Sequence, residues 1–264
     1  MKFHQFFSRC GLAVIVTGLV WVSAGQLAAQ DVATQDAAAE PAAADAPEGN
    51  AGLPLLEEAI QKKLEVRRVA DLDRVAELCQ EALAQGLDEG QSKFARSLYS
   101  ATLLEKTMRV VEPLLEGKLD ITWNQRRTLA LAELDKAAKV NPEDAEVQLL
   151  IAQLHELPGG DPELGGAAAK NAAKYFADRP DRRSEALALQ AAFVDDLDEK
   201  LKLYDEAIQI DQTNWSAWRD RGRVKFDLGK AEEAIQDFEQ VLEKNAGDSE
   251  TLQVLAGVLA SQER

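Results

Sequence analysis

Hydrophobic residues recur at every third or fourth position along almost the whole chain from Leu53 onward. This spacing follows the 3.6-residue turn of an α-helix, whereas a half-buried strand alternates at every second residue. No stretch shows sustained alternation with β-branched residues, so strands are not expected. Two early runs show the helical spacing: Leu55, Leu56, Ala59, Ile60 and Leu64, then Val75, Leu78, Cys79, Ala82 and Leu83, with Asp71 as the predicted cap. The pattern predicts an all-α fold of helices joined by short turns.

Five helices carry the same stripe of four residues, spaced so that all four fall on one helix face. The stripes are Val75, Cys79, Ala82 and Leu83; Ala130, Leu134, Ala137 and Ala138; Ala168, Ala172, Tyr175 and Phe176; Lys200, Tyr204, Ala207 and Ile208; and Ala234, Phe238, Val241 and Leu242. Small residues between large ones allow two helices to approach closely. The last four stripes start 38, 32 and 34 residues apart, which indicates a repeated helix pair.

The segment from Trp215 to Asp248 resembles a tetratricopeptide repeat. The family's aromatic residue, small residues and second-helix stripe are matched by Trp218, Gly222, Gly229, Ala234, Phe238 and Leu242. Residues 130–144, ALAELDKAAKVNPED, resemble the second helix and closing turn, with Asn141 and Pro142 opening the next helix at 145–154. The resemblance extends from Pro54 to the C-terminus. It implies a right-handed superhelical solenoid (tetratricopeptide-like, TPR-like) of about five antiparallel helix pairs and a final unpaired helix.

Three charged residues depart from the family pattern. Lys200 replaces the usual alanine, and Arg221 and Lys225 replace a leucine and an aromatic residue of a first helix. The missing bulk is expected from Trp215, Trp218 and Phe226.

Two connections also depart from it. The glycines from Gly159 to Gly166 are predicted to lengthen the third hairpin turn. A longer insertion separates the first two stripes, where Gln91 to Val111 predicts one long helix that ends before Pro113.

The N-terminal region indicates export. Lys2 and Arg9 precede an apolar run from Gly11 to Val22, which predicts a signal peptide over residues 1–29. The run is short for a membrane span, so cleavage is expected, and retention as an inner-membrane anchor is the alternative. Residues 30–53 are rich in alanine and acidic residues, which predicts a disordered linker before a repeat domain at 54–264. The expected location is periplasmic or extracellular.

Composition narrows the chemistry. The formal charge of −16 argues against nucleic acid, because phosphates require clusters of Lys and Arg. Beyond residue 29, Cys79 is the only cysteine and His155 the only histidine, which leaves no internal disulfide and no set of zinc ligands. No nucleophile or phosphate-loop motif occurs. The sequence therefore predicts a protein that is not an enzyme, with no catalytic residues, no cofactor and no metal.

The candidate site follows from the resemblance. In tetratricopeptide repeats the first helices line a concave groove, and the matching positions here are Ser216, Arg219, Arg223 and Phe226 in one helix and Glu146, Leu149 and Gln153 in another. Arg219 and Arg223 lie one turn apart, so both can hold one carboxylate, such as a peptide C-terminus. The alternative is that they only form salt bridges with Asp220 or Asp227.

The family resemblance implies a scaffold that binds a protein or peptide ligand, here during assembly of the cell envelope. The alternative is a docking region of a longer envelope enzyme, a protease or thiol-oxidoreductase, with catalysis beyond Arg264. The last predicted helix is apolar on two sides, with Leu252, Leu255, Ala256 and Leu259 on one and Val254 and Val258 widening it. We expect this helix to pair with further chain or with another molecule, so self-association is a third interpretation.

Overall fold

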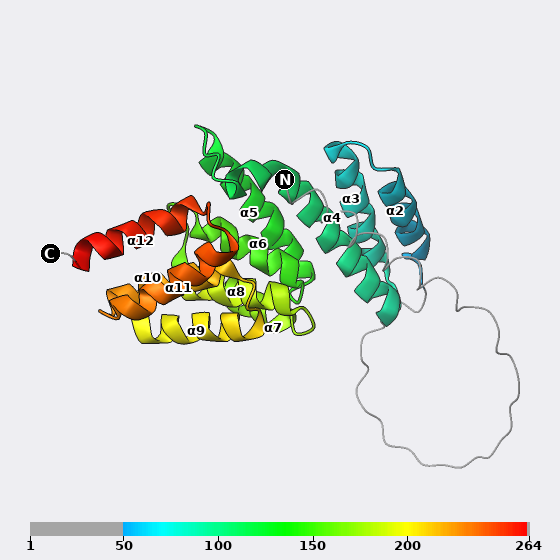
Figure 1. Cartoon of the computed structure of the whole chain (residues 1–264). Coiled ribbons are helices and arrows are strands. Elements are labelled where there is room, and N and C mark those ends of the chain that lie inside the picture. The colour runs from blue at the N-terminus through cyan, green and yellow to red at the C-terminus, as the bar shows by residue number, and fades with distance from the viewer. Residues whose placement is uncertain (1–49, 263–264) are drawn as a thin grey trace, which may run out of the picture. The chain divides into compact units, whose positions relative to one another are not determined.

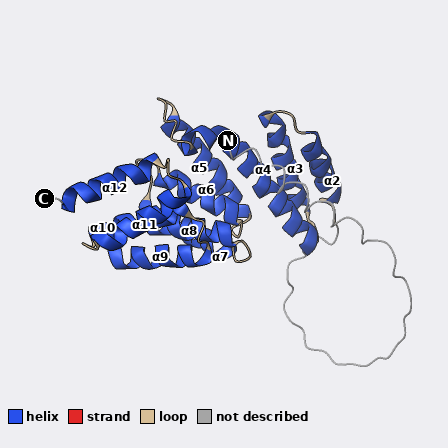
Figure 2. Cartoon of the chain, viewed as in Figure 1, coloured by secondary structure: helices blue, strands red, loops and turns tan. Residues whose placement is uncertain are grey.

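The computed structural model describes residues 50–262, in which eleven helices and no strand are found (Figure 1). The helices are α2 (Leu53–Glu65), α3 (Val69–Gln85), α4 (Glu89–Leu115), α5 (Trp123–Val140), α6 (Ala145–Glu156), α7 (Pro162–Tyr175), α8 (Pro180–Ala192), α9 (Leu197–Ile210), α10 (Trp215–Asp227), α11 (Ala231–Lys244) and α12 (Ser249–Gln262). Short loops join them (Figure 2). The predicted all-α fold is confirmed, and the predictions for residues 1–49 lie outside the described part.

The helices pack in two alternating sets. Each helix contacts the next one along the chain, from α2 with α3 through to α11 with α12. The first helices of successive pairs, α4, α6, α8, α10 and α12, also contact one another in turn, whereas within the described part no comparable contact joins α5, α7, α9 and α11. A stack whose first helices lie closer together than its second helices curves toward the first helices. Within residues 50–262, the first helices therefore line the inner side.

The predicted stripes of the second helices form the core. One residue from each stripe illustrates this, and none of the five has any exposed surface: Cys79, Leu134, Ala172, Ala207 and Phe238. These side chains alternate with alanines that are equally buried, as the spacing predicted. Burial of this apolar surface is the main favourable contribution to the free energy of folding.

The closest approach in the last complete pair joins Gly222 of α10 to Phe238 of α11. A Cβ atom placed on Gly222 would lie 2.7 Å from Cε1 of Phe238, which is closer than carbon atoms approach in proteins. Phe238 is fully buried, so its ring has no free space into which to move. The small residue of the repeat pattern is thus required by the packing of one aromatic ring.

The prediction for the third hairpin turn is partly wrong. Gly165 lies inside α7 and is buried, so only Gly159 and Gly160 belong to the turn. A Cβ atom on Gly165 would lie 2.4 Å from Cζ of Phe193, the residue that follows α8. The glycine is present because an aromatic ring packs directly on the helix backbone, not because the chain turns there.

The predicted end of the long helix is also wrong, because α4 continues through Pro113 to Leu115. A proline removes only its own N–H group, so close to a helix end the loss is one hydrogen bond. The helix is ended by Gly117, whose φ of 75° lies in the left-handed region. The N–H of Lys118 then donates to the carbonyl of Pro113 at 2.9 Å, a common glycine-terminated helix end.

Two predicted helix caps lie at other positions. Asp71 lies inside the first turn of α3, where its carboxylate accepts the N–H groups of Arg67 at 3.1 Å and Arg68 at 2.8 Å. Asn141 ends α5 instead of opening α6, which is capped by the carboxylate of Asp144. Arg68 holds the N-cap position of α3 and Asp71 completes a capping box from the first turn, whereas Asp144, three residues after Asn141, holds the N-cap position of α6.

The repeat domain begins before the predicted boundary at residue 54. The side chain of Asn50 accepts the N–H of Asp88 at 3.0 Å, and Gly52 donates its N–H to the carbonyl of Gly86 at 2.9 Å. A Cβ atom on Gly52 would lie 2.0 Å from the carbonyl oxygen of Ala82. Residues 50–53 are therefore held against the end of α3 and are not part of the predicted linker.

Charge replaces apolar packing between α10 and α11. Asp237 of α11 is 3% exposed, and its two oxygens accept from Nε and Nη2 of Arg221 at 2.8 and 2.7 Å. Lys225 reaches the same carboxylate at 2.9 Å, and Arg221 also lies over the ring of Trp218 and pairs with the more exposed Asp205. Two of the three cations that depart from the family pattern are thus partners of one buried acid.

Replacing Gly222 with alanine tests the close approach. We expect Gly222→Ala to lower the free energy of unfolding by about 1–3 kcal/mol, because the added methyl overlaps the ring of Phe238. The matched control is Gly257→Ala in α12, where an added Cβ meets nothing within 4 Å. That variant should be neutral or more stable by up to about 1 kcal/mol in urea unfolding. Equal effects of the two variants would contradict the packing argument.

Replacing Asp237 with alanine tests the buried charge network. Two cations would then lack a buried partner, so we expect Asp237→Ala to cost about 3–5 kcal/mol of unfolding free energy. Asp205→Ala removes only the exposed partner of Arg221 and should cost less than about 1 kcal/mol. Chemical denaturation of both variants measures the difference, and a small loss for Asp237→Ala would show that the network is not needed.

Candidate functional site: the face of the first helices

The candidate site lies on the side of the molecule formed by the first helices. We use the name first-helix face for the polar residues that connect α6 to α8 and α10 to α12: Glu146, Gln153, Arg182, Glu185, Arg219, Asp220, Arg223 and Glu250. These helices contact one another in succession. Residues one turn apart share one side of a helix, so they can face the neighbouring helix together. These residues form two clusters of alternating charge.

The first cluster joins α10 to α12 through a carboxylate held by two arginines. Nη1 of Arg219 lies 3.0 Å from one oxygen of Glu250, and Nη2 of Arg223 lies 2.7 Å from the other. Asp220 lies beside both arginines, with Nη1 of Arg223 donating to it at 2.8 Å. Both arginines therefore form salt bridges within the chain, with Asp220 as the alternative interpretation expected and with Glu250 in addition, so that the two guanidiniums hold one carboxylate of the protein itself.

The second cluster joins α6 to α8. Glu146 accepts from Nη1 of Arg179 at 3.1 Å and from Arg182, which also donates to Glu185. Gln153 donates to the same Glu185 at 2.9 Å. Here again one carboxylate lies between two guanidiniums that come from the next first helix.

Partial burial shifts the pKa values of acids on and beside this face. Burial raises the pKa of Glu185 and of Asp220, although neighbouring arginines act in the opposite direction. Desolvation also raises the pKa of Glu156 at the end of α6, and the charge of Asp220 adds to this effect. In such an environment a positive ligand group is stabilised beside the acids and a negative one beside the arginines. The face can therefore discriminate between ligands by where their charges lie.

The predicted site residues lie in different environments. Arg219 and Arg223 lie in the first cluster, and Glu146 and Gln153 lie in the second. Leu149 has no exposed surface and packs in the core, so its prediction as a groove residue is wrong. Position 149 faces the core because α6 packs against both α7 and α8.

The two remaining predicted residues lie at opposite ends of α10. Ser216 is exposed. Phe226 packs partly against the small core cluster of Ala234, Phe238 and Val258, so only part of its ring is accessible.

Sequence reasoning missed half of the first-helix face. Arg182 and Glu185 precede the Lys200 stripe by 18 and 15 residues, the same separations that place Ser216 and Arg219 before the Ala234 stripe. Applying the repeat spacing to α8 would have found both. Glu250 is different, because its role depends on how α12 packs against α10.

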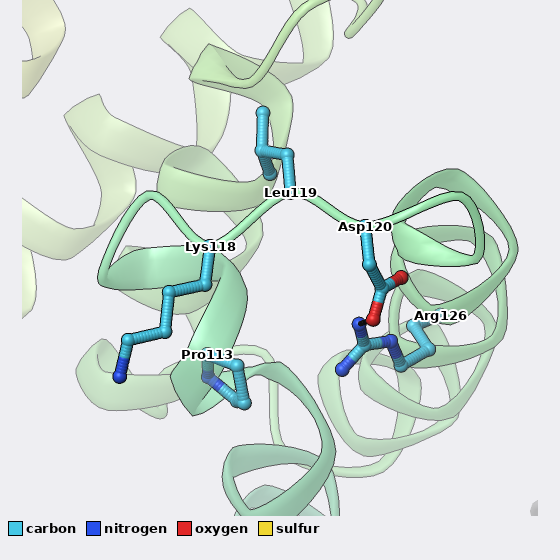
Figure 3. Close-up of a pocket in the computed structure, with 5 residues that line it drawn as sticks. All are labelled: Pro113, Lys118, Leu119, Asp120 and Arg126. Atoms are coloured by element: carbon cyan, nitrogen blue, oxygen red, sulfur yellow. Dashed lines mark hydrogen bonds and ion pairs between the residues drawn. The ribbon is translucent and has the colours of Figure 1, made fainter.

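A shallow cavity of about 480 Å³ lies elsewhere, at the connection between α4 and α5 (Figure 3). It is lined by Pro113, Lys118, Leu119, Asp120 and Arg126. Asp120 accepts from the N–H and hydroxyl of Thr122 at 2.8 and 2.7 Å and from Arg126, and these bonds lower its pKa to about 2. The carboxylate of Asp120 is thus occupied by groups of its own loop and of α5, and these bonds stabilise the loop.

The cysteine singled out in the sequence is part of the packed core. Burial raises the pKa of the Cys79 thiol to about 12, so the thiolate form is not available at neutral pH. Among residues 50–262 no cluster of His, Cys, Asp and Glu could hold a metal ion. In the same part of the chain, no helix combines the length and the apolar character needed to cross a bilayer.

Comparison with known proteins identifies the fold. No family model and no curated protein matches the sequence. The solved structure titled YrrB, a TPR protein with an unusual peptide-binding site, is 15% identical, with a TM-score of 0.52 over 77% of this chain and 91% of that one.

Two further solved structures show lower similarity. MamA is 14% identical with a TM-score of 0.47, over 76% of this chain and 95% of that one. A thermophilic TPR protein from Thermus thermophilus is 15% identical with a TM-score of 0.40, over 80% and 100%. At the identity found for YrrB, the likeness concerns the fold. The chain has the tetratricopeptide-repeat fold, the right-handed solenoid of antiparallel helix pairs that the spacing and the resemblance predicted.

The single histidine of the described residues gives a prediction about pH. Nδ1 of His155 accepts the N–H of Asp161 at 3.0 Å. Burial, the largest effect, and then the charge of Arg127 lower the pKa of His155, while Asp161 raises it. Protons therefore bind the unfolded chain preferentially, and the stability contributed by the neutral ring is present above the normal pKa of 6.5 and lost as the pH falls through the lowered value.

The variant His155→Asn keeps a hydrogen-bond acceptor but does not titrate. We expect the free energy of unfolding of the wild type to fall relative to this variant as the pH is lowered from neutral to weakly acidic. Denaturant titrations at a series of pH values measure the difference. Parallel pH profiles for the two proteins would contradict the assignment.

Proposed function

We propose that this protein is a non-enzymatic scaffold that binds a protein or peptide on the first-helix face. The observation that carries the proposal is the carboxylate of Glu250, held by Arg219 and Arg223 with one oxygen for each guanidinium. A site that holds a carboxylate from its own chain has the geometry to hold one from a ligand. The tetratricopeptide-repeat fold supports this, since a protein of the same fold is described by its title as having a peptide-binding site.

The ligand group at this position is a carboxylate, from a peptide C-terminus or an acidic side chain. Glu250 is 52% exposed at its side chain, so an incoming carboxylate can reach the arginines and replace it. Asp220 stays beside them and prevents the binding of a ligand that carries several negative charges close together. The second cluster, at Glu146 and Arg182, offers the next charged contact along the same face.

The proposed setting is the cell envelope. Residues 1–29 have the features of an export signal, which supports a periplasmic or extracellular location, with membrane attachment only through this segment if it is not cleaved. The acidic spacer that follows would hold the repeat domain away from the membrane. The net charge of −16 supports protein partners over nucleic acid.

The first step of the test is to identify the partner by cross-linking in cells and mass spectrometry. Its segments are then prepared as peptides with either a free or an amidated C-terminus. We expect binding to depend on a carboxylate and to be lost in Arg219→Gln/Arg223→Gln. The matched control is Arg74→Gln in α3, an exposed arginine that also pairs with several glutamates. Equal capture by both variants would contradict the proposed site.

The carboxylate of Glu250 allows a second test, in which the affinity for the peptide is expected to rise instead of fall. Glu250→Gln removes the group that competes for the arginines, so it should raise the affinity for the same peptide about two- to fivefold, the value of an exposed ion pair. Fluorescence anisotropy measures this change. A loss of affinity in Glu250→Gln would show that Glu250 belongs to the binding surface and does not compete with the ligand.

A further inference from the structure

The last helix, α12, buries one face and exposes another. Thr251 and Val258 are buried against α10 and α11, whereas Leu252 and Leu259 are each 45% exposed, with the exposed Ala256 between them. Positions 252, 256 and 259 follow the spacing of one helix face. The exposed side of α12 is therefore a continuous apolar stripe.

The repeat pattern shows what this stripe is suited to bind. Ala256 follows Gly222 by 34 residues, one repeat length, so it occupies the same position in α12 that Gly222 occupies in α10. In α10 this position receives the ring of Phe238 from the second helix of the pair. The stripe on α12 thus has the form of a surface that packs against a helix, and no helix covers it within the described residues.

Charge distribution selects the occupant. The twelve residues from Thr251 to Gln262 include no Asp, Glu, Lys or Arg, in a chain that is 29% charged and has a net charge of −16. Two copies of such an acidic protein repel each other at most surfaces, and an uncharged helix is where they can meet. The centres of protein interfaces are depleted of charged residues in the same way. An oppositely charged partner would gain nothing from this surface.

The stripe is also complementary to itself. Leu252 lies four residues before Ala256 and Leu259 lies three residues after it, so the two leucines are almost evenly spaced about the alanine. In an antiparallel pair related by a two-fold axis near Ala256, Leu252 of each copy meets Leu259 of the other. Ala256 at the centre has a small side chain, so the two backbones can approach closely.

We propose that this protein forms a two-fold symmetric dimer in which α12 packs antiparallel against α12 of a second copy. The proposal does not depend on the ligand of the first-helix face. Glu250 lies two residues before Leu252 and so on the opposite side of α12 from the stripe. Dimer formation would therefore leave the arginine pair accessible in each copy and present two binding faces in one particle.

Sedimentation equilibrium of the purified protein over a wide range of concentrations tests the proposal. We expect a monomer–dimer equilibrium that Leu252→Glu/Leu259→Glu weakens about a hundredfold or more, since four leucines in two contacts are replaced by like charges. The matched control is Leu64→Glu in α2, because Leu64 is 66% exposed and lies far from α12 in sequence. Circular dichroism verifies that each variant remains helical.

A charge-paired variant distinguishes the antiparallel arrangement from others. In Leu252→Glu/Leu259→Lys, each new carboxylate faces a new ammonium group in the antiparallel dimer, so dimerisation should recover relative to the variant with two glutamates. In a parallel pair, like charges would face each other and no recovery would occur. A wild type that stays monomeric at every concentration, a dimer unaffected by the two glutamates, or an absence of recovery would each overturn the proposal.

Discussion

Close contact between a small residue on one helix and a large one on its partner is the interaction on which the structure depends. Gly222 against Phe238 is its clearest example, and Gly165 of α7 against Phe193, which follows α8, is a similar contact between successive pairs. Because the small residue carries no side chain to separate the helices, each pair packs tightly, and successive pairs stack with the first helices on the inner side. The first-helix face exists because of this arrangement.

Charged residues occupy positions where the packing does not need apolar ones. Asp237 is buried with Arg221 and Lys225, and this network replaces the leucine and aromatic residue common in the family. On the first-helix face, arginines and acids connect neighbouring first helices instead of filling the core. The ligand proposed for this face would contact the same residues that stabilise the stack, so its binding and the stability of the stack would be coupled.

The sequence predicts the fold well because the stripes of the second helices reflect burial, which is repeated along the chain. Local features are predicted less well. Pro113 indicates a helix end, but Gly117 a few residues later supplies the left-handed turn that ends α4. Leu149 matches a groove position, yet it is buried because α6 packs against helices on two sides. Identifying Glu250 as a partner of Arg219 requires knowledge of how α12 lies on α10, which no local pattern contains.

The most direct test of the central claim is hydrogen exchange of backbone amides in the repeat domain with and without the bound partner. The account predicts that the partner slows exchange in the first helices α6, α8 and α10, around the two charged clusters, and leaves the second helices α7, α9 and α11 unchanged. Protection confined to the second helices would place the partner on the outer side of the stack and contradict the account.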